Sequence, residues 1–321
     1  MAPDSQAEED SITVSTAFLE RLTPADRALP QRLLHLLENS PDVTYADARV
    51  RLLDGYEEPG EEALDATSCQ NFLVEIHKML KTLEHRYHNL SSHIMVAPGI
   101  FLDYNIVHGL KEPLSERDII RKLTAIWCHD VGHVGNTYRQ ITPGAIANNM
   151  SNEEFSVLVV LAAAYDMGIF TLEDLDRIGN DILASTFFQR PVNVADKCPA
   201  LARSYEDDRD DSGKIIAFVD VAYYLNGTDA WLQGGLDIAA ENGMSFADIY
   251  KFLDFGYGFL HGYVRVRLAE IEHLLKPESY AEILLKLEAV LADLTELSPS
   301  GRNHKGREQL TAKATALGLL P

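Results

Sequence analysis

The sequence predicts an all-α fold, a bundle of many helices. Apolar residues recur at steps of three and four over most of the chain, as they do along one face of an α-helix. Strand signals are nearly absent, because the β-branched clusters lie inside the same helical periodicity. Hydrophobic residues make up 46% of the 321 residues, which is typical of a folded protein and not of a disordered one.

The periodicity divides the chain into four parts. Residues 1–12 lack apolar periodicity and are predicted to be a flexible acidic tail. Residues 13–64 form short amphipathic helices, and residues 65–296 form the main helical domain. Residues 297–321 are predicted to be a C-terminal tail.

The main domain is predicted to begin with a long helix over residues 65–93, in which Phe72, Ile76 and Leu80 share one face. Ser115 and Asp118 fit a capping box that opens the next helix. Further helices are expected over residues 152–166, 171–185, 192–204, 213–226, 245–275 and 278–296.

The charge composition limits the partners. The chain has 49 acidic and 28 basic residues, so its formal net charge is −21, which argues against DNA, RNA or anionic membranes as main partners. Residues 297–321 have the opposite balance, with four basic residues and one acidic residue.

No apolar run approaches the roughly 20 residues of a transmembrane helix, and the acidic start does not resemble a secretory signal. Three scattered cysteines indicate no disulfide framework, so we expect a cytoplasmic protein.

The strongest chemical motif is Cys128-His129-Asp130-Val131-Gly132-His133, at the end of an apolar helix. An imidazole nitrogen and a carboxylate oxygen suit zinc or a similar divalent ion, and a bridging carboxylate can recruit a second ion. His133 follows His129 by four residues and lies on the same face if the helix continues. Because a single His-Asp pair often occurs by chance, this interpretation depends on further ligands elsewhere in the chain.

Two further strings carry a resemblance to a known family. Tyr87-His88-Asn89-Leu90-Ser91-Ser92-His93 precedes the His-Asp motif, and His129 follows His93 by 36 residues. Val194-Ala195-Asp196-Lys197-Cys198-Pro199 comes after the motif. Taken in this order, the three strings resemble the class I cyclic nucleotide phosphodiesterases, a branch of the HD superfamily of metal-dependent phosphohydrolases.

The resemblance implies a site with two divalent metal ions, two catalytic histidines and two substrate-binding aromatic residues. The implied ligands of a first, zinc-like ion are His93, His129, Asp130 and Asp196, and Asp130 would bridge to a second ion, Mg²⁺ or Mn²⁺. His88 would be the general acid that protonates the leaving ribose O3′, and His133 would support the second ion. Tyr87 and Phe259 are the implied substrate-binding residues.

This chemistry has a physical basis of its own. A phosphodiester anion resists attack by hydroxide, and two cations would neutralise the anion and lower the pKa of a water held between them. The leaving alkoxide is a strong base, so the reaction needs a positioned acid. Histidine is the side chain that can be protonated near neutral pH.

Two segments depart from the family pattern. The helix over residues 152–166 becomes apolar where family members place a glutamate and a histidine pair, so Glu153, Glu154 and Asp166 are candidate substitutes. In Gly256-Tyr257-Gly258-Phe259-Leu260, Phe259 matches the ring-clamping phenylalanine, whereas Gly256 stands where the family has its purine-reading glutamine. Specificity for cAMP or cGMP is therefore open, and a plain aromatic core stripe explains the cluster around Phe259 equally well.

We therefore expect metal-dependent hydrolysis of a phosphodiester, with a 3′,5′-cyclic nucleotide as one candidate substrate. The alternatives are an HD-type phosphohydrolase of another small phosphorylated substrate, a di-iron HD-type oxygenase, and a non-catalytic HD binding module. Residues 134–260 contain no histidine, which counts against the oxygenase, because its site needs further histidine ligands. A homodimer is also compatible with the sequence.

Overall fold

The computed structural model describes residues 13–22, 27–41, 43–81, 95–103, 106–135, 150–186 and 209–321. Over these ranges the chain is helical and has no β-strand, and one isolated antiparallel bridge joins Leu110 to Leu275. The predicted all-α fold is confirmed. Within the same ranges, no helix has the length and apolar character needed to cross a lipid bilayer.

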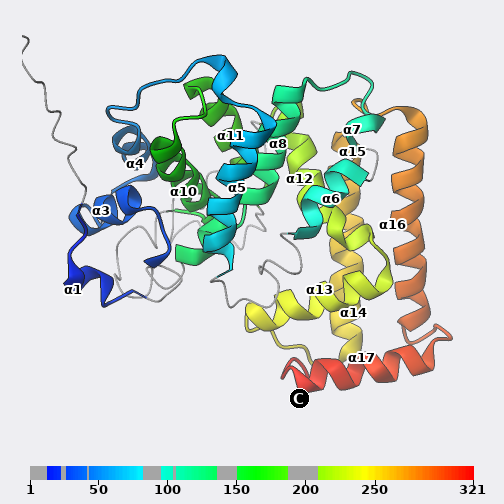
Figure 1. The fold of residues 1–321 in the computed structure, drawn as a ribbon. Coiled ribbons are helices and arrows are strands. Elements are labelled where there is room, and N and C mark those ends of the chain that lie inside the picture. Colours follow the sequence, from blue (N-terminus) through cyan, green and yellow to red (C-terminus); the bar gives the residue numbers. More distant parts are fainter. Residues whose placement is uncertain are drawn as a thin grey trace, which may run out of the picture.

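A first group of helices surrounds a core formed by the N-terminal half of the chain (Figure 1). Its members are α1 (Thr16–Leu19), α3 (Gln31–Asn39), α4 (Tyr45–Leu52), the short 3-10 helix η1 (Glu61–Ala63), α5 (Ala66–Leu80), α10 (Asn152–Met167) and α11 (Leu172–Ala184). Leu33, Phe72 and Phe155 are among its buried side chains. The helices of residues 13–64 thus share one core with α5 and α10.

A second group surrounds a second core (Figure 1). Its members are α6 (Met95–Asp103), α7 (Ile106–Gly109), α12 (Asp211–Ala222), the 3-10 helix η5 (Tyr223–Leu225), α13 (Thr228–Glu241), α14 (Ile249–Phe259), the π-helix η6 (Leu260–Val264), α15 (Arg265–Glu270), α16 (Pro277–Leu297) and α17 (His304–Ala316). Trp231, Phe252 and Leu287 are buried at its centre.

Helix α8 (Glu116–Cys128) lies between the two groups (Figure 1). Ala125 and Cys128 belong to the first core, and Ile126 belongs to the second. The predicted cap is present: the Ser115 hydroxyl accepts a hydrogen bond from the Asp118 backbone N–H (3.1 Å) and donates one to the Asp118 carboxylate (2.6 Å). The C-terminal end of α8, which carries the His-Asp motif, is thereby placed at the junction of both cores.

Three helix predictions need correction. Helix α13 was not predicted, and its consecutive Gly234 and Gly235 explain why, since glycine lowers helix propensity. Residues 245–275, predicted as one helix, contain α14, a π-helical turn and α15. Residues 297–321, predicted as a tail, contain α17, which buries Leu310 and Ala314 against the second core. The helix predicted over residues 192–204 lies outside the described residues.

A buried carboxylate joins α11 to α8. Asp174, which is fully buried, accepts hydrogen bonds from Nε (2.8 Å) and Nη2 (2.6 Å) of Arg117 and from Nε of Arg121 (2.7 Å). It also accepts the backbone N–H and the hydroxyl of Thr171, both at 2.8 Å, in the capping box of α11. Burial alone would raise the pKa of Asp174, but the hydrogen bonds from Arg117, Thr171 and Arg121 lower it below the ordinary 3.8.

We expect Asp174→Asn to lower the free energy of unfolding by about 3–5 kcal/mol, because it removes the buried charge that Arg117 and Arg121 share. The pKa of Asp174 is lower in the folded than in the unfolded chain, so its contribution is complete above about pH 4 and is lost as the pH falls through the folded-state value. Urea unfolding at pH 7 and pH 3 measures both effects. Asp176→Asn on the same helix, where the side chain is 57% exposed, is the control and should change little.

A second buried contact links α8 to α12. The Lys122 ammonium donates a hydrogen bond to the Ser212 hydroxyl (2.6 Å) and lies 3.5 Å from the Asp181 carboxylate. The Ser212 hydroxyl donates in turn to Asp181 (2.8 Å). This contact fixes the position of α12 along α8, and α12 carries an aspartate that belongs to the site described next.

Candidate metal centre

His129 is the centre of the site. It is the residue directly after α8 and is buried, with 2% of its surface exposed. Its Nδ1 lies 2.6 Å from the carbonyl oxygen of Ile126. Because a carbonyl can only accept, Nδ1 carries a proton in this contact, and Nε2 is the nitrogen left to bind a second proton or a cation.

Two carboxylates face this Nε2 atom. Asp130 Oδ2 and Asp220 Oδ1 each lie 3.1 Å from it. Burial alone would lower the pKa of His129, but the charges and hydrogen bonds of the two aspartates raise it well above the ordinary 6.5. The structure therefore brings together the predicted His129 and Asp130 with a third donor, Asp220.

Asp220 was not among the predicted ligands. It lies on α12, 90 residues after Asp130, in the apolar run Ile215-Ile216-Ala217-Phe218-Val219-Asp220-Val221-Ala222. A carboxylate inside such a run was the available signal, because an acidic residue on a mostly buried helix needs a partner. No local string surrounds Asp220, whereas Asp196 lies in a string that resembles the family motif.

His133 adjoins the site from the turn after α8. Its Nε2 lies 3.6 Å from Asp130 Oδ1, and the Asn152 amide nitrogen approaches its ring at 3.2 Å. The condition for a shared helical face is not met, because the α-helix does not continue from His129 to His133. The α-helix ends at Cys128, and the 3-10 helix η3 (Val131–Gly135) follows, with the His133 N–H donating to the Asp130 carbonyl at 3.1 Å.

The start of α10 holds this turn in place. The Ser156 hydroxyl donates to the carbonyl oxygen of His129 (2.6 Å) and accepts from the backbone N–H of Gly132 (2.8 Å). A Cβ atom at Gly132 would overlap the carbonyl oxygen of Asn152, so only glycine allows α10 to lie this close. Ser156 thus fixes the backbone on both sides of the His-Asp pair.

Of the three candidate acidic residues on this helix, Glu153 is the one whose pKa is influenced by the charges of the site. Burial raises its pKa, and the negative charges of Asp130 and Asp220 raise it further. Glu154 is fully buried and accepts the Ser151 backbone N–H (3.0 Å) as part of the capping box of α10. Asp166, at the other end of the helix, interacts with the charge of Arg32 instead.

Four predicted site residues lie outside the described residues: Tyr87, His88, His93 and Asp196. Their roles stay predictions. The first string also differs by one position from the YHNxxH pattern of the phosphodiesterases, because three residues separate Asn89 from His93. This extra residue weakens the match at His93 in particular.

Phe259 lies at the end of α14, in an aromatic cluster. Its ring packs edge-on against Tyr224 (5.3 Å between centroids) and stacks on Tyr263 (5.5 Å). Tyr224 follows Asp220 by four residues, so the cluster begins about one helical turn from the carboxylate. Whether Phe259 contacts a substrate stays a prediction.

Position 256, which corresponds to the family's glutamine in the resemblance, has no space for a side chain. A Cβ atom at Gly256 would overlap the indole ring of Trp231, which is 2% exposed. Trp231 therefore occupies the volume that a side chain at position 256 would need. The chain has no room here for an amide that reads a purine edge.

The donor set fits a divalent ion in its chemistry. Two carboxylate oxygens at 3.1 Å from an imidazole lone pair repel it, unless a proton or a cation lies between them. Donors bound tetrahedrally to one zinc ion at about 2.0–2.2 Å are about 3.4 Å apart. The 3.1 Å from His129 Nε2 to each carboxylate oxygen is slightly shorter than this. Among the described residues, no group of three or more His, Cys, Asp or Glu side chains has a geometry that could already hold a metal ion.

Comparisons with known protein families, with curated proteins and with solved structures find no significant match to the chain.

Proposed function

We propose that the chain is a metal-dependent phosphohydrolase, acting on a phosphodiester or another small phosphorylated substrate. The observation that carries the proposal is the position of His129, whose Nε2 atom lies 3.1 Å from both Asp130 and Asp220 while Nδ1 is bound to the Ile126 carbonyl. A histidine oriented through its second nitrogen, with carboxylates around the first, is the usual arrangement of a metal ligand.

His129, Asp130 and Asp220 would hold the ion. A bound divalent cation would neutralise the phosphate charge and acidify a water molecule. The Ser156 contact would hold the backbone of His129 and the Ile126 contact its ring, so that this donor is oriented before the ion binds. Glu153, whose raised pKa reflects burial and the nearby aspartates, is suited to accept a proton at the edge of the site.

The proton for the leaving group would come from a histidine. His88 would have this role by resemblance. Among the described residues of the site, His133 is the second histidine, beside Asp130 and Asn152.

The substrate class that we propose is small phosphorylated molecules in general, because Trp231 fills the place of a purine-reading side chain at Gly256. Phosphate chemistry is favoured over the oxygenase, since residues 134–260 contain no histidine that could complete a di-iron site.

The test combines metal analysis with hydrolysis assays. The purified chain, equilibrated with Zn²⁺ and Mg²⁺ and dialysed, is expected to retain metal and to hydrolyse at least one of bis(p-nitrophenyl) phosphate, p-nitrophenyl phosphate, cAMP and cGMP. We expect Asp220→Asn to lose bound metal and at least about 100-fold in turnover. Asp254→Asn, on the 73% exposed side chain of α14, is the matched control and should retain both.

Two results would contradict the proposal. Undiminished metal content and turnover in Asp220→Asn would remove this residue from the site. A native chain that retains no metal and hydrolyses none of the four compounds would favour a non-catalytic binding module.

A further inference from the structure

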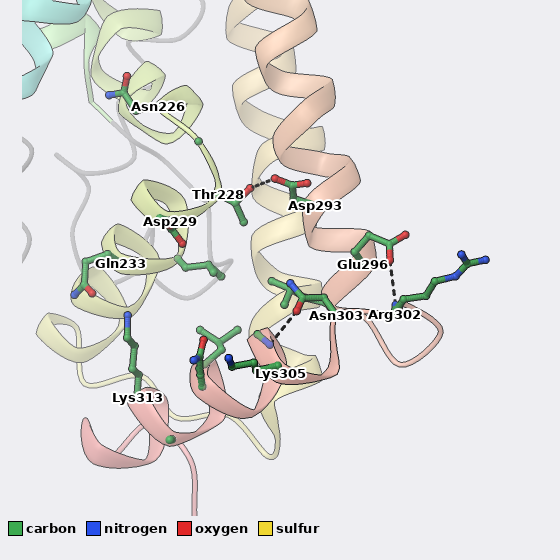
Figure 2. Close-up of a pocket in the computed structure, with 17 residues that line it drawn as sticks. Asn226, Thr228, Asp229, Gln233, Asp293, Glu296, Arg302, Asn303, Lys305 and Lys313 are labelled. Carbon is green, nitrogen blue, oxygen red and sulfur yellow. Dashed lines mark hydrogen bonds between the residues drawn. The ribbon is translucent and has the colours of Figure 1, made fainter.

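A wide groove lies in the second group of helices, and His129 is not among the residues that line it. The groove has a volume of about 1590 Å³ and lies between α13, the C-terminal end of α16 and α17. Figure 2 shows α13 on one side and α17 on the other, with the end of α16 between them. Its floor is partly apolar, with Leu232, Leu297 and Leu310.

Most charges of the groove are separated by sign, the exception being Arg302, which follows the acidic end of α16. Asp293 and Glu296 on α16, together with Asp229 on α13, form what we term the acidic wall. Lys305 and Lys313 on α17 form the basic wall (Figure 2). Within the described residues, neither lysine forms an ion pair, although carboxylates line the same groove. The two walls therefore face each other without neutralising each other.

Three of the five wall charges oppose the dipole of their own helix, whereas Asp229, in the first turn of α13, and Lys313, in the last turn of α17, have the favoured sign. Asp293 and Glu296 lie near the C-terminal end of α16, whose last turn holds no basic residue. Lys305 lies in the first turn of α17, which holds no acidic residue. Acidic side chains stabilise the start of a helix and basic side chains its end, so each of these charges slightly destabilises its own helix. Asp293 accepts a hydrogen bond from the Thr228 hydroxyl (2.5 Å) and Glu296 accepts one from the backbone N–H of Arg302 (3.1 Å), but neither contact neutralises the carboxylate charge (Figure 2).

We infer that this face binds a second copy of the chain, with the basic wall of each copy opposite the acidic wall of the other. A surface with an acidic half beside a basic half is complementary to itself under a two-fold rotation. The rest of the chain opposes association, because two copies each carry a net charge of −21. Residues 297–321, with four basic residues and one acidic residue, supply the local attraction that another copy requires.

The test exchanges the charges of one wall at a time. The native chain at about 100 µM is expected to be a dimer in about 50 mM NaCl and to dissociate in about 500 mM, by sedimentation velocity, because salt screens the pairing. We expect Lys305→Glu/Lys313→Glu and Asp293→Lys/Glu296→Lys each to weaken association at least about tenfold, since both halves of the interface become repulsive. Three of the four changes bring each helix end closer to its favoured charge, and circular dichroism confirms folding.

Mixing the two double variants gives the sharpest result. In a mixed pair, one half of the interface carries both exchanged walls and the other half carries both native walls, so both halves are again complementary. We therefore expect the mixture to dimerise as the native chain does. Lys78→Glu/Lys81→Glu and Glu57→Lys/Glu58→Lys make the same charge changes in the first group of helices and should leave the dimer intact.

Three outcomes would overturn the inference. They are a native chain that is monomeric in low salt, a dimer that neither double variant weakens, and a mixture that stays monomeric when each variant alone is monomeric. Sedimentation velocity measures neither metal binding nor hydrolysis, so a result that overturns the dimer does not bear on the proposed function.

Discussion

Gly132→Ala is expected to disrupt the turn that carries His129 and Asp130. The added methyl group would overlap the carbonyl oxygen of Asn152 and crowd the backbone nitrogen of Ser156, so α10 or the turn must move. Forcing atoms into such a contact costs about 3 kcal/mol or more of folding free energy. Any displacement also breaks the Ser156 hydrogen bonds that position His129.

Two measurements check this expectation. Urea unfolding should show the loss of stability, and Zn²⁺ titration should show an affinity lowered by about 10- to 100-fold, as when outer contacts of a metal ligand are lost. Gly258→Ala is the control, because nothing lies within 4 Å of its added atom. If Gly132→Ala unfolds like the native chain, then α10 does not lie against the His-Asp turn as described.

Gly256→Gln should also be damaging, although it introduces the residue that the cyclic nucleotide phosphodiesterases have in the string that Gly256–Leu260 resembles. Its Cβ atom would overlap the buried indole of Trp231, which packs on Phe252 at 5.5 Å between ring centroids. Displacing this indole from the second core is expected to cost at least about 3 kcal/mol. We therefore expect an unstable or insoluble variant, and no gain in hydrolysis of cAMP or cGMP.

Gly258→Gln separates this steric effect from a general effect of glycine replacement. It lies two residues further along α14, with no atom within 4 Å of the added carbon. There glutamine improves helix propensity by less than about 1 kcal/mol, so the control should be as stable as the native chain or slightly more. Equal thermal stability of the two variants would show that Trp231 does not fill the space beside position 256.

Local sequence signals predicted much of the fold, because helix starts are encoded locally. Ser115 caps α8, and the helices predicted over residues 152–166 and 171–185 match α10 and α11. Helix α17 was missed for the opposite reason. Its buried contacts are limited to Leu310 and Ala314, so the helix depends on packing against the second core and carries a weak apolar periodicity.

The site was predicted in part for the same reason. His129 and Asp130 are neighbours in the sequence, so one motif reveals both. Asp220 joins them only because α12 packs against α8, a relation set by the Lys122, Ser212 and Asp181 contacts and by both cores. A spacing of 90 residues carries no local pattern from which this contact could be deduced.

The position of α8 between two cores has a consequence for how the chain unfolds. Because its side chains complete both the first and the second core, loss of either group of helices would expose an apolar face of α8 to water. The two halves are thereby coupled thermodynamically and should melt in one cooperative transition. A ligand held at the C-terminal end of α8 would stabilise both halves at once, including regions far from any atom that it touches.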